Sequence, residues 1–261
     1  MNEGVERAHR DGILSTASLM VAGPAAADAV RRAASVPGLR VGLHLVVIEG
    51  PAADPAAAPA LVDAAGQFPS GQLRLGIGYA FSPVQRRQLA AEIRAQFRAF
   101  AATGLRLDHA NAHKHMHLHP TVGRMMIGIG REFGLTAIRI PAEPPSVMAA
   151  LGVPQGPGAR ALHAWTRLLR LQARRAGLHT NDHAFGIAWS GHMTAARLLR
   201  LAPQLPVGLS ELYFHPAASR DALLTRLMPE YEHEAELAAL CDPAVRTALA
   251  RAGIGLTTYG V

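Results

Sequence analysis

Histidine is concentrated in one short stretch of the chain, from Leu107 to Pro120. The stretch reads L-D-H-A-N-A-H-K-H-M-H-L-H-P and holds five of the thirteen histidines, at positions 109, 113, 115, 117 and 119. Neutral imidazole is the commonest side-chain metal ligand near pH 7. Residues two apart in an extended strand point to the same face, so we expect His113, His115 and His117 to project together. The stretch predicts a metal site in which one or two histidines bind the ion, while others position substrate or support the ligands.

Two other histidines lie within or directly after apolar segments that are typical of buried strands. His44 lies within Leu39–Ile48, and His215 follows Val207–Phe214. The carboxyl ends of parallel strands meet at one edge of a sheet, where α/β folds place their chemistry. Three strands would therefore deliver imidazoles to one site. Taken alone, His44 is better explained as a hydrogen-bonded core histidine. A histidine-rich stretch can also bind metal without chemistry, but the placement of this one at the end of a strand favours a metal site.

The composition is that of a folded protein rather than a disordered one. Of the 261 residues, 49% are hydrophobic and 17% are charged, which is enough for one large α/β domain spanning residues 1–261. The net charge of +7 permits contact with anionic partners. We expect no nucleic-acid partner, because no such motif is present and the 5% of aromatic residues supply few stacking platforms. The single cysteine excludes an internal disulfide.

Predicted strands and helices alternate along the chain, which favours a mostly parallel sheet, either open or closed into a barrel. We expect loops at Glu49–Gln72, rich in Pro, Ala and Gly, and at His179–Ser190. Ser82 is the expected N-cap of the longest helix, with Pro83 in its first turn. The other expected strands are Leu14–Ala22, Thr136–Ile140 and Ile254–Tyr259, and the expected helices are Asn2–Gly12, Ala25–Ser35, Ser82–Thr103, Thr121–Phe133, Ala159–Ala176, Glu230–Leu240 and Pro243–Ala252.

The segment Ala159–Ala176 combines five arginines with apolar residues in a helical pattern. A basic amphipathic helix can lie on an anionic membrane surface, and the alternative is a solvated face on an arginine-rich protein. No apolar run is long enough to cross a membrane, and the first residues do not form a signal peptide. We therefore expect a cytoplasmic protein, with peripheral contact at the inner face of the membrane as a further expectation.

Five segments of the chain resemble the YdjC-like carbohydrate deacetylase family. They are N-E-G-V-E-R-A, T-A-S-L-M-V-A, V-G-L-H-L, N-A-H-K-H-M-H-L-H-P and E-L-Y-F-H-P, and together they extend over essentially the whole sequence. The last two segments are most similar to the hopanoid-biosynthesis-associated branch. The resemblance implies an α/β fold, a distorted (β/α) barrel of the polysaccharide-deacetylase-like type. It also implies hydrolysis of the N-acetyl group of an amino sugar, and specifically of an N-acetylglucosaminyl hopanoid lipid.

The resemblance further implies a divalent metal, Mg²⁺ or Zn²⁺, held by one aspartate and two histidines. Carried over to this sequence, the two histidines are His44 and His113. The histidine of the late H-P motif, His215, would be the general acid that protonates the leaving amine. For the sugar we expect contacts from four residues, His115, His117, Arg139 and Glu143. Many relatives carry aspartate where this chain has Asn111.

The chain departs from the family pattern at its start. The family opens with a strand that ends in an Asp-Asp pair, whereas this sequence begins at the helix of N-E-G-V-E-R-A. We therefore expect the first strand, the metal-binding aspartate and the base to be missing from this sequence, and the natural chain to be longer. Two other readings remain: an amidohydrolase-type enzyme that binds two metals through His-x-His, and a non-catalytic metal or sugar binder. A homodimer is compatible with all three readings.

Overall fold

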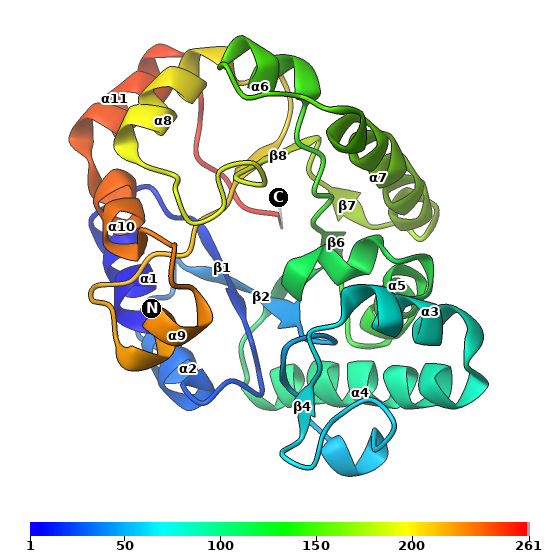
Figure 1. The fold of residues 1–261 in the computed structure, drawn as a ribbon. Helices are drawn as coiled ribbons and strands as arrows, with labels where there is room; N and C mark the ends of the chain where they lie inside the picture. The colour runs from blue at the N-terminus through cyan, green and yellow to red at the C-terminus, as the bar shows by residue number, and fades with distance from the viewer. Residues whose placement is uncertain (260–261) are drawn as a thin grey trace.

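A parallel sheet of five strands forms the centre of the computed structural model, which describes residues 1–259. The strands lie in the order β1-β2-β5-β6-β7 (Figure 1). Their bounds are Thr16–Leu19 for β1, Arg40–Leu45 for β2, Leu107–Ala112 for β5, Ala137–Ile138 for β6 and His179–Thr180 for β7. Every pairing in this sheet is parallel, which confirms the predicted α/β class with a parallel sheet.

Two small sheets accompany the main one. Strands β8 (His183–Phe185) and β9 (Ser210–Leu212) pair in parallel, and β3 (Gly50–Pro51) pairs with β4 (Gln67–Phe68) in antiparallel. Asn181 joins β8 to the main sheet, because its side chain bonds both backbone groups of Ile140 and the carbonyl of His183. No sheet within residues 1–259 closes on itself, so a complete barrel is not confirmed.

Eleven α-helices surround these sheets within the described residues. The longest, α4, begins as the sequence predicts: the Ser82 hydroxyl accepts a hydrogen bond from the Gln85 backbone N–H, and Pro83 occupies the first turn. The helices are α1 (Asn2–Arg10), α2 (Ala26–Ala34), α3 (Gln72–Phe81), α4 (Pro83–Ala102), α5 (Pro120–Glu132), α6 (Pro145–Ala150), α7 (Pro157–Arg175), α8 (Ala195–Leu201), α9 (Ala222–Leu227), α10 (His233–Cys241) and α11 (Pro243–Arg251). Short 3-10 helices are η1 (Pro55–Ala57), η2 (His113–Leu118) and η3 (Ala202–Gln204).

Two clusters of buried apolar side chains stabilise the fold. The first joins β2, β5 and β6 to α4 and α5, with Leu43, Ile93 and Ile138 fully buried. The second joins α8, α10 and α11 to the end of β8, with Phe185 and Leu201 fully buried. Figure 1 shows α4 and α5 on one side of the molecule and α8, α10 and α11 grouped on the other. The carboxyl ends of the central strands lie between these two packed regions.

The histidine-rich stretch differs from its predicted form. Strand β5 ends at Ala112, and the chain continues as the 3-10 helix η2. Lys114 and His115 adopt left-handed backbone conformations, with φ of 49° and 54°. Two consecutive left-handed residues cannot continue a pleated strand. The prediction that the alternate histidines 113, 115 and 117 project together from one strand face is therefore wrong.

Other boundaries also differ from the sequence-based expectations. The predicted strand Ile254–Tyr259 is irregular in the structure, and the predicted loop His179–Ser190 contains the two short strands β7 and β8. Helices α3, α6, α8 and α9 were not expected from the sequence. Within residues 1–259, no helix has both the length and the apolar character needed to span a membrane.

Candidate active site

His44 and His113 lie side by side at the carboxyl ends of adjacent strands. The register of β2 and β5 pairs His44 with Asn111 and Leu45 with Ala112, so His113 follows directly where its strand ends. The two ring centroids are 5.6 Å apart, with the rings inclined at 71°. The structure therefore brings together the two residues that the sequence singles out as metal ligands.

A hydrogen bond fixes the orientation of the His44 ring. Its Nδ1 lies 2.5 Å from Oδ1 of Asn111, and a carbonyl oxygen can only accept. The proton of the neutral ring is therefore on Nδ1, and Nε2 carries the lone pair. Burial, followed by the proximity of His113, holds the pKa of His44 well below its usual value. Burial also lowers the pKa of His113. Both rings are neutral at pH 7, which is the form that binds metal.

The remaining histidines of the stretch lie in and after η2, and the ring centroids of His115 and His117 are 6.1 Å apart. The His115 ring turns toward Tyr213, whose hydroxyl lies 3.4 Å from its Nε2. His117 donates from Nε2 to the backbone carbonyl of Arg139 at 3.1 Å. Lys114 forms an ion pair with Glu49, which also has a left-handed backbone with φ of 47°. Burial lowers the pKa of His115 to about 4, so this ring is neutral as well.

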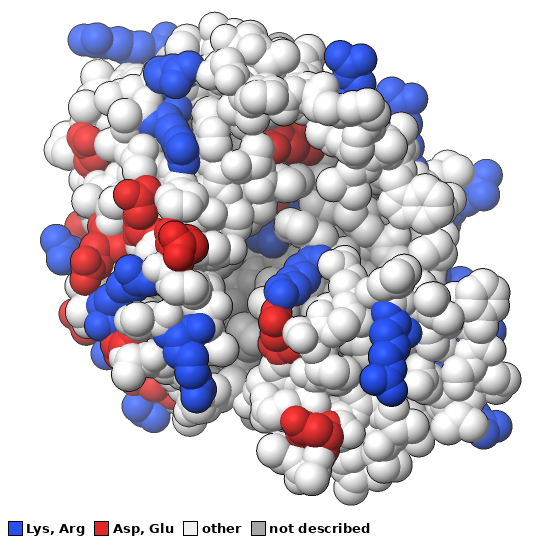
Figure 2. Space-filling view, in the orientation of Figure 1, with Lys and Arg blue, Asp and Glu red and all other residues white. Residues whose placement is uncertain are grey.

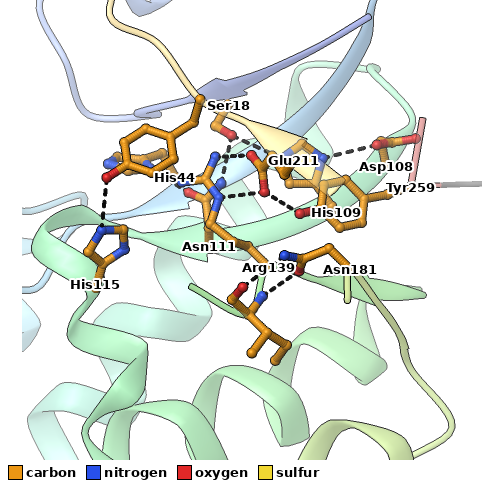
Figure 3. Close-up of polar contacts among 12 residues, drawn as sticks. Ser18, His44, Asp108, His109, Asn111, His115, Arg139, Asn181, Glu211 and Tyr259 are labelled. Carbon is orange, nitrogen blue, oxygen red and sulfur yellow. Dashed lines mark hydrogen bonds and ion pairs between the residues drawn. The ribbon is translucent and has the colours of Figure 1, made fainter. Parts of the chain in front are cut away.

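Arg139 and Glu211 form a buried ion pair beside these histidines (Figure 3). Arg139 donates from Nε to the Glu211 carboxylate at 2.8 Å and from Nη2 to its second oxygen. The Tyr259 hydroxyl donates to the same carboxylate. Burial opposes the charge on Arg139, but the Glu211 carboxylate outweighs it and holds the pKa of Arg139 above its usual range. The guanidinium also lies over the Tyr213 ring, 5.1 Å from its centroid.

His215 is held by its backbone just beyond β9. Its N–H donates to Glu236 at 2.5 Å, and its carbonyl accepts from Nδ1 of His233 at 2.5 Å. Its own Nδ1 is buried and has no hydrogen-bond partner among the described residues. Burial, and then the charge of Arg139, lower the pKa of His215 to about 3. The imidazole is therefore neutral at pH 7 and able to accept a proton.

Glu143, expected to contact the sugar, has its carboxylate engaged by the backbone. Its two oxygens accept hydrogen bonds from the N–H groups of Gly186, Ile187 and Ala188 at 3.0–3.1 Å. Burial raises the pKa of Glu143, although these three donors act in the opposite direction. Glu143 thus fixes the loop after β8. Sugar contacts by Glu143, Arg139, His115 and His117 remain predictions.

The residues around the histidine pair supply part of a metal site. His44 and His113 offer two neutral imidazole nitrogens, and the ring spacing is short enough for one ion to lie between them. A third protein ligand is not brought to them: within residues 1–259 no three His, Cys, Asp or Glu side chains gather as a metal-binding group. The neighbouring Asn111 uses its oxygen for His44 instead. The two imidazoles would therefore be two of the three protein ligands that a catalytic zinc site typically has.

Several residues of this site had no individual role in the sequence-based prediction. Tyr213, Glu211 and Asn111 contact the predicted residues His115, Arg139 and His44. Tyr259 in turn bonds Glu211, and Ser18 bonds Asn111. Tyr213 and Glu211 belong to the E-L-Y-F-H-P segment, so the motif itself was the available signal. Figure 2 shows a hollow on this face of the molecule, between the side that carries α9 and α10 and the side that carries α3 and α4.

Comparisons with known proteins find curated relatives of this chain. The chain is 28% identical to a carbohydrate deacetylase from Geobacillus stearothermophilus over 261 residues, which covers 99% of this chain and 91% of that protein. It is 35% identical to a carbohydrate deacetylase from Brevibacillus brevis over 133 residues, about half of each protein (51% and 51%). Both relatives are named carbohydrate deacetylase, which confirms the predicted enzyme class.

A solved structure from Enterococcus faecalis V583, described as a cellobiose-phosphate cleavage protein, has a similar fold. It superposes with a TM-score of 0.72 at 20% identity, covering 99% of this chain and 91% of that one. At this identity the likeness concerns the fold alone. The model of the family described as YdjC-like protein matches residues 1–251. Because this match covers nearly its whole length, the chain belongs to the YdjC-like protein family.

Proposed function

We propose that this protein is a carbohydrate deacetylase that hydrolyses the N-acetyl group of an acetylated amino sugar at a divalent metal held by His44 and His113. The observation that supports the metal most directly is the orientation of His44, whose Nδ1–H bond to Asn111 leaves Nε2 with its lone pair, together with the short distance of 5.6 Å between the ring centroids of His44 and His113. Imidazole ligands suit Zn²⁺ better than Mg²⁺, which prefers oxygen, so we propose Zn²⁺ of the two expected ions. When bound, such an ion polarises a carbonyl group and lowers the pKa of a water molecule.

We propose that His215 transfers the proton from the attacking water to the leaving amine during hydrolysis. Its buried Nδ1 has no hydrogen-bond partner among the described residues, and we propose that this neutral imidazole takes a proton from the attacking water and then gives it to the leaving amine. The general acid of the sequence-based prediction would thus also serve as the base. Its backbone is fixed by Glu236 and His233, which keeps the ring in place between the two transfers.

Arg139, His115 and His117 are proposed to line the sugar. His115 and His117 each have one buried Nδ1 without a hydrogen-bond partner among the described residues. A sugar hydroxyl could donate to either nitrogen, and a buried acceptor is costly to leave unpaired. The Arg139 guanidinium is held in position by Glu211 and can present its remaining N–H groups.

A lipid-linked substrate, the hopanoid sugar, is a finer proposal that rests on the outer face of α7. Trp165, Leu168 and Leu171 are 46%, 38% and 46% exposed, and the exposed Arg167 and Arg174 lie on the same helix. The Trp165 indole donates to the carbonyl of Leu118 in η2 at 2.9 Å, so this helix lies against the histidine-rich segment. An apolar and basic helix face beside the site is suited to an anionic lipid surface.

The lipid proposal can be tested by vesicle flotation. The full chain should float with phosphatidylglycerol vesicles and not with phosphatidylcholine vesicles. Replacing Arg160, Arg167 and Arg174 with Glu should abolish flotation. Arg170 is left unchanged because its guanidinium donates to the backbone carbonyl of Asp182. Undiminished flotation of the variant would remove the support for a membrane-bound substrate.

The deacetylase proposal is tested by acetate release. We expect the full chain to release acetate from N-acetylglucosamine oligomers, to lose this activity after chelation, and to regain it with Zn²⁺. His113→Ala should abolish both Zn²⁺ binding and turnover. The exposed His179, changed to Ala, is the matched control and should retain both. Retained stoichiometric Zn²⁺ in the His113→Ala protein would show that His113 is not a ligand.

One rival reading has an observation in its favour. The lack of a third protein ligand within residues 1–259 is what a non-catalytic binder would show. That reading predicts binding of the acetylated sugar without acetate release at saturating Zn²⁺. The amidohydrolase-type reading instead predicts two ions per chain, which elemental analysis of the purified protein would detect.

A further inference from the structure

Five polar side chains form a continuous series of hydrogen bonds that ends at His44 (Figure 3). Asp108 bonds Nδ1 of His109 at 3.0 Å, and Nε2 of His109 bonds the Ser18 hydroxyl at 3.0 Å. The amide nitrogen of Asn111 donates to the Ser18 oxygen at 2.8 Å, and the amide oxygen of Asn111 accepts from His44. The series connects three neighbouring strands, β1, β2 and β5.

The chemistry of the first member fixes the direction of every bond. A carboxylate oxygen accepts, so the Nδ1–H of His109 donates to Asp108, and in a neutral ring Nε2 is then an acceptor. The Ser18 hydroxyl must then donate to His109, and its oxygen is left to accept from the Asn111 amide. This orients the amide oxygen of Asn111 toward His44 and places the His44 proton on Nδ1. One acceptor at the start of the series thus determines which nitrogen of His44 carries the lone pair.

The series is built into the packing of the sheet rather than exposed at its surface. Asp108, His109 and Asn111 are 5%, 1% and 0% exposed. A Cβ atom on Gly42 would lie 2.5 Å from the backbone oxygen of His109 and 2.6 Å from its ring. Only a residue without a side chain leaves this space. The Tyr259 ring covers the other side, stacked on His109 at 4.7 Å between centroids.

We propose that Asp108, His109 and Ser18 are positioning residues that act through Asn111 to hold His44 in the Nδ1–H tautomer. That this tautomer serves metal binding rests on the proposed function. That His44 adopts this tautomer is independent of the proposed function. Partners that fix the outer nitrogen of a ligating histidine typically account for about 10–100-fold in metal affinity.

The order Asp-His-Ser also occurs where serine is a nucleophile. Here the Ser18 oxygen accepts a hydrogen bond from Asn111, and the Ser18 hydroxyl proton is donated to the buried His109. We therefore assign the hydroxyl to the hydrogen-bond series and not to nucleophilic attack. The two roles differ in their products. A nucleophilic Ser18 would retain an acetyl group in intact-mass measurements after rapid mixing with substrate, and that result would overturn the proposed role.

The test measures the His44 tautomer in the metal-free full chain by ¹⁵N NMR of labelled histidine. The unmodified protein should show a protonated Nδ1 and an unprotonated Nε2. Ser18→Ala removes the link that orients the Asn111 amide, and Asp108→Asn replaces the obligatory acceptor with a group that can also donate. Both variants should show a mixture of the two tautomers. Ser18→Thr, which keeps the hydroxyl, should restore the single form, and the exposed Asp11→Asn should leave it unchanged.

A Zn²⁺ titration of the same proteins supplies a second measurement. Ser18→Ala should weaken Zn²⁺ binding by about 10–100-fold, with recovery in Ser18→Thr. A single Nδ1–H tautomer in both Ser18→Ala and Asp108→Asn would overturn the inference, even if the protein binds Zn²⁺. A mixed tautomer in these variants would support it even if the unmodified protein binds no Zn²⁺, and in that case only the proposed function fails.

Discussion

Arg139 and Glu211 are joined by two hydrogen bonds in the interior, although they lie 72 positions apart in the chain. Arg139 directly follows β6 and Glu211 lies in β9, so the pair ties the main sheet to the small β8–β9 sheet. Tyr259 adds a third donor to the same carboxylate. The main sheet and the β8–β9 sheet are thus connected by an ion pair as well as by the hydrogen bonds of Asn181.

Breaking this pair should lower stability strongly. Glu211→Gln leaves the Arg139 charge buried without its partner, and the loss of one member of a buried pair costs about 3–5 kcal/mol. We expect a decrease of that size in the free energy of unfolding, measured with urea. The exposed pair of Arg94 with Glu132 is the matched control, and Glu132→Gln should cost about 0–1 kcal/mol. Similar losses for the two variants would contradict the role assigned to Glu211.

Acid should destabilise the protein through its buried neutral histidines. The pKa of His215 is about 3 in the folded chain and 6.5 in the unfolded one. Between these values the unfolded state binds the extra proton, so the free energy of unfolding falls as the pH is lowered from about 6.5 toward 3. His215→Gln should make this fall shallower, as measured by urea midpoints at pH 7.5 and pH 5. An unchanged pH dependence would show that His215 is not neutral in the folded state.

Gly42 should be intolerant of any side chain. Gly42→Ala places a Cβ atom within 2.7 Å of the His109 carbonyl and ring, so β2 and β5 must shift apart or the ring must move. Such overpacking typically costs about 1–3 kcal/mol. Thermal unfolding measures the loss, and the His44 tautomer reports the displaced His109. Gly128→Ala, on a helix with open space around the new Cβ, is the control and should be neutral or stabilising.

Glu143 should matter for the loop after β8 more than for the proton transfers. Glu143→Gln keeps one acceptor oxygen for the three backbone donors of residues 186–188 and loses the other. We expect faster amide hydrogen exchange at Gly186, Ile187 and Ala188, with a modest rise in KM and little change in kcat. A large loss of kcat with unchanged exchange would assign Glu143 a direct part in the chemistry instead.

Local pattern was sufficient for the parts of the fold that depend on neighbouring residues. The Ser82 cap and the apolar run that became β2 both follow from short-range signals. The left-handed turn at Lys114 and His115 does not, because residues other than glycine rarely adopt such a conformation and no local signal announced it. The pattern of alternation in the stretch was therefore interpreted as a strand.

The parts of the fold and of the site that local pattern did not predict depend on long-range contacts. The segment before Tyr259 alternates like a strand, but its Tyr259 hydroxyl bonds Glu211 and its ring covers His109, so side-chain contacts rather than a ladder hold it. The partners of Ser18 lie more than ninety positions away. No sequence window contains such pairs, and only the resemblance of whole motifs pointed to this region of the chain.

The turn at Lys114 and His115 has a consequence for how the histidine-rich stretch tolerates change. On a flat strand, neighbouring imidazoles would share one space, and the loss of one could be compensated by the next. Here His113 faces His44, His115 faces Tyr213, and His117 bonds the backbone of Arg139. Because each ring has a different partner, we expect that the loss of one imidazole is not compensated by its neighbour.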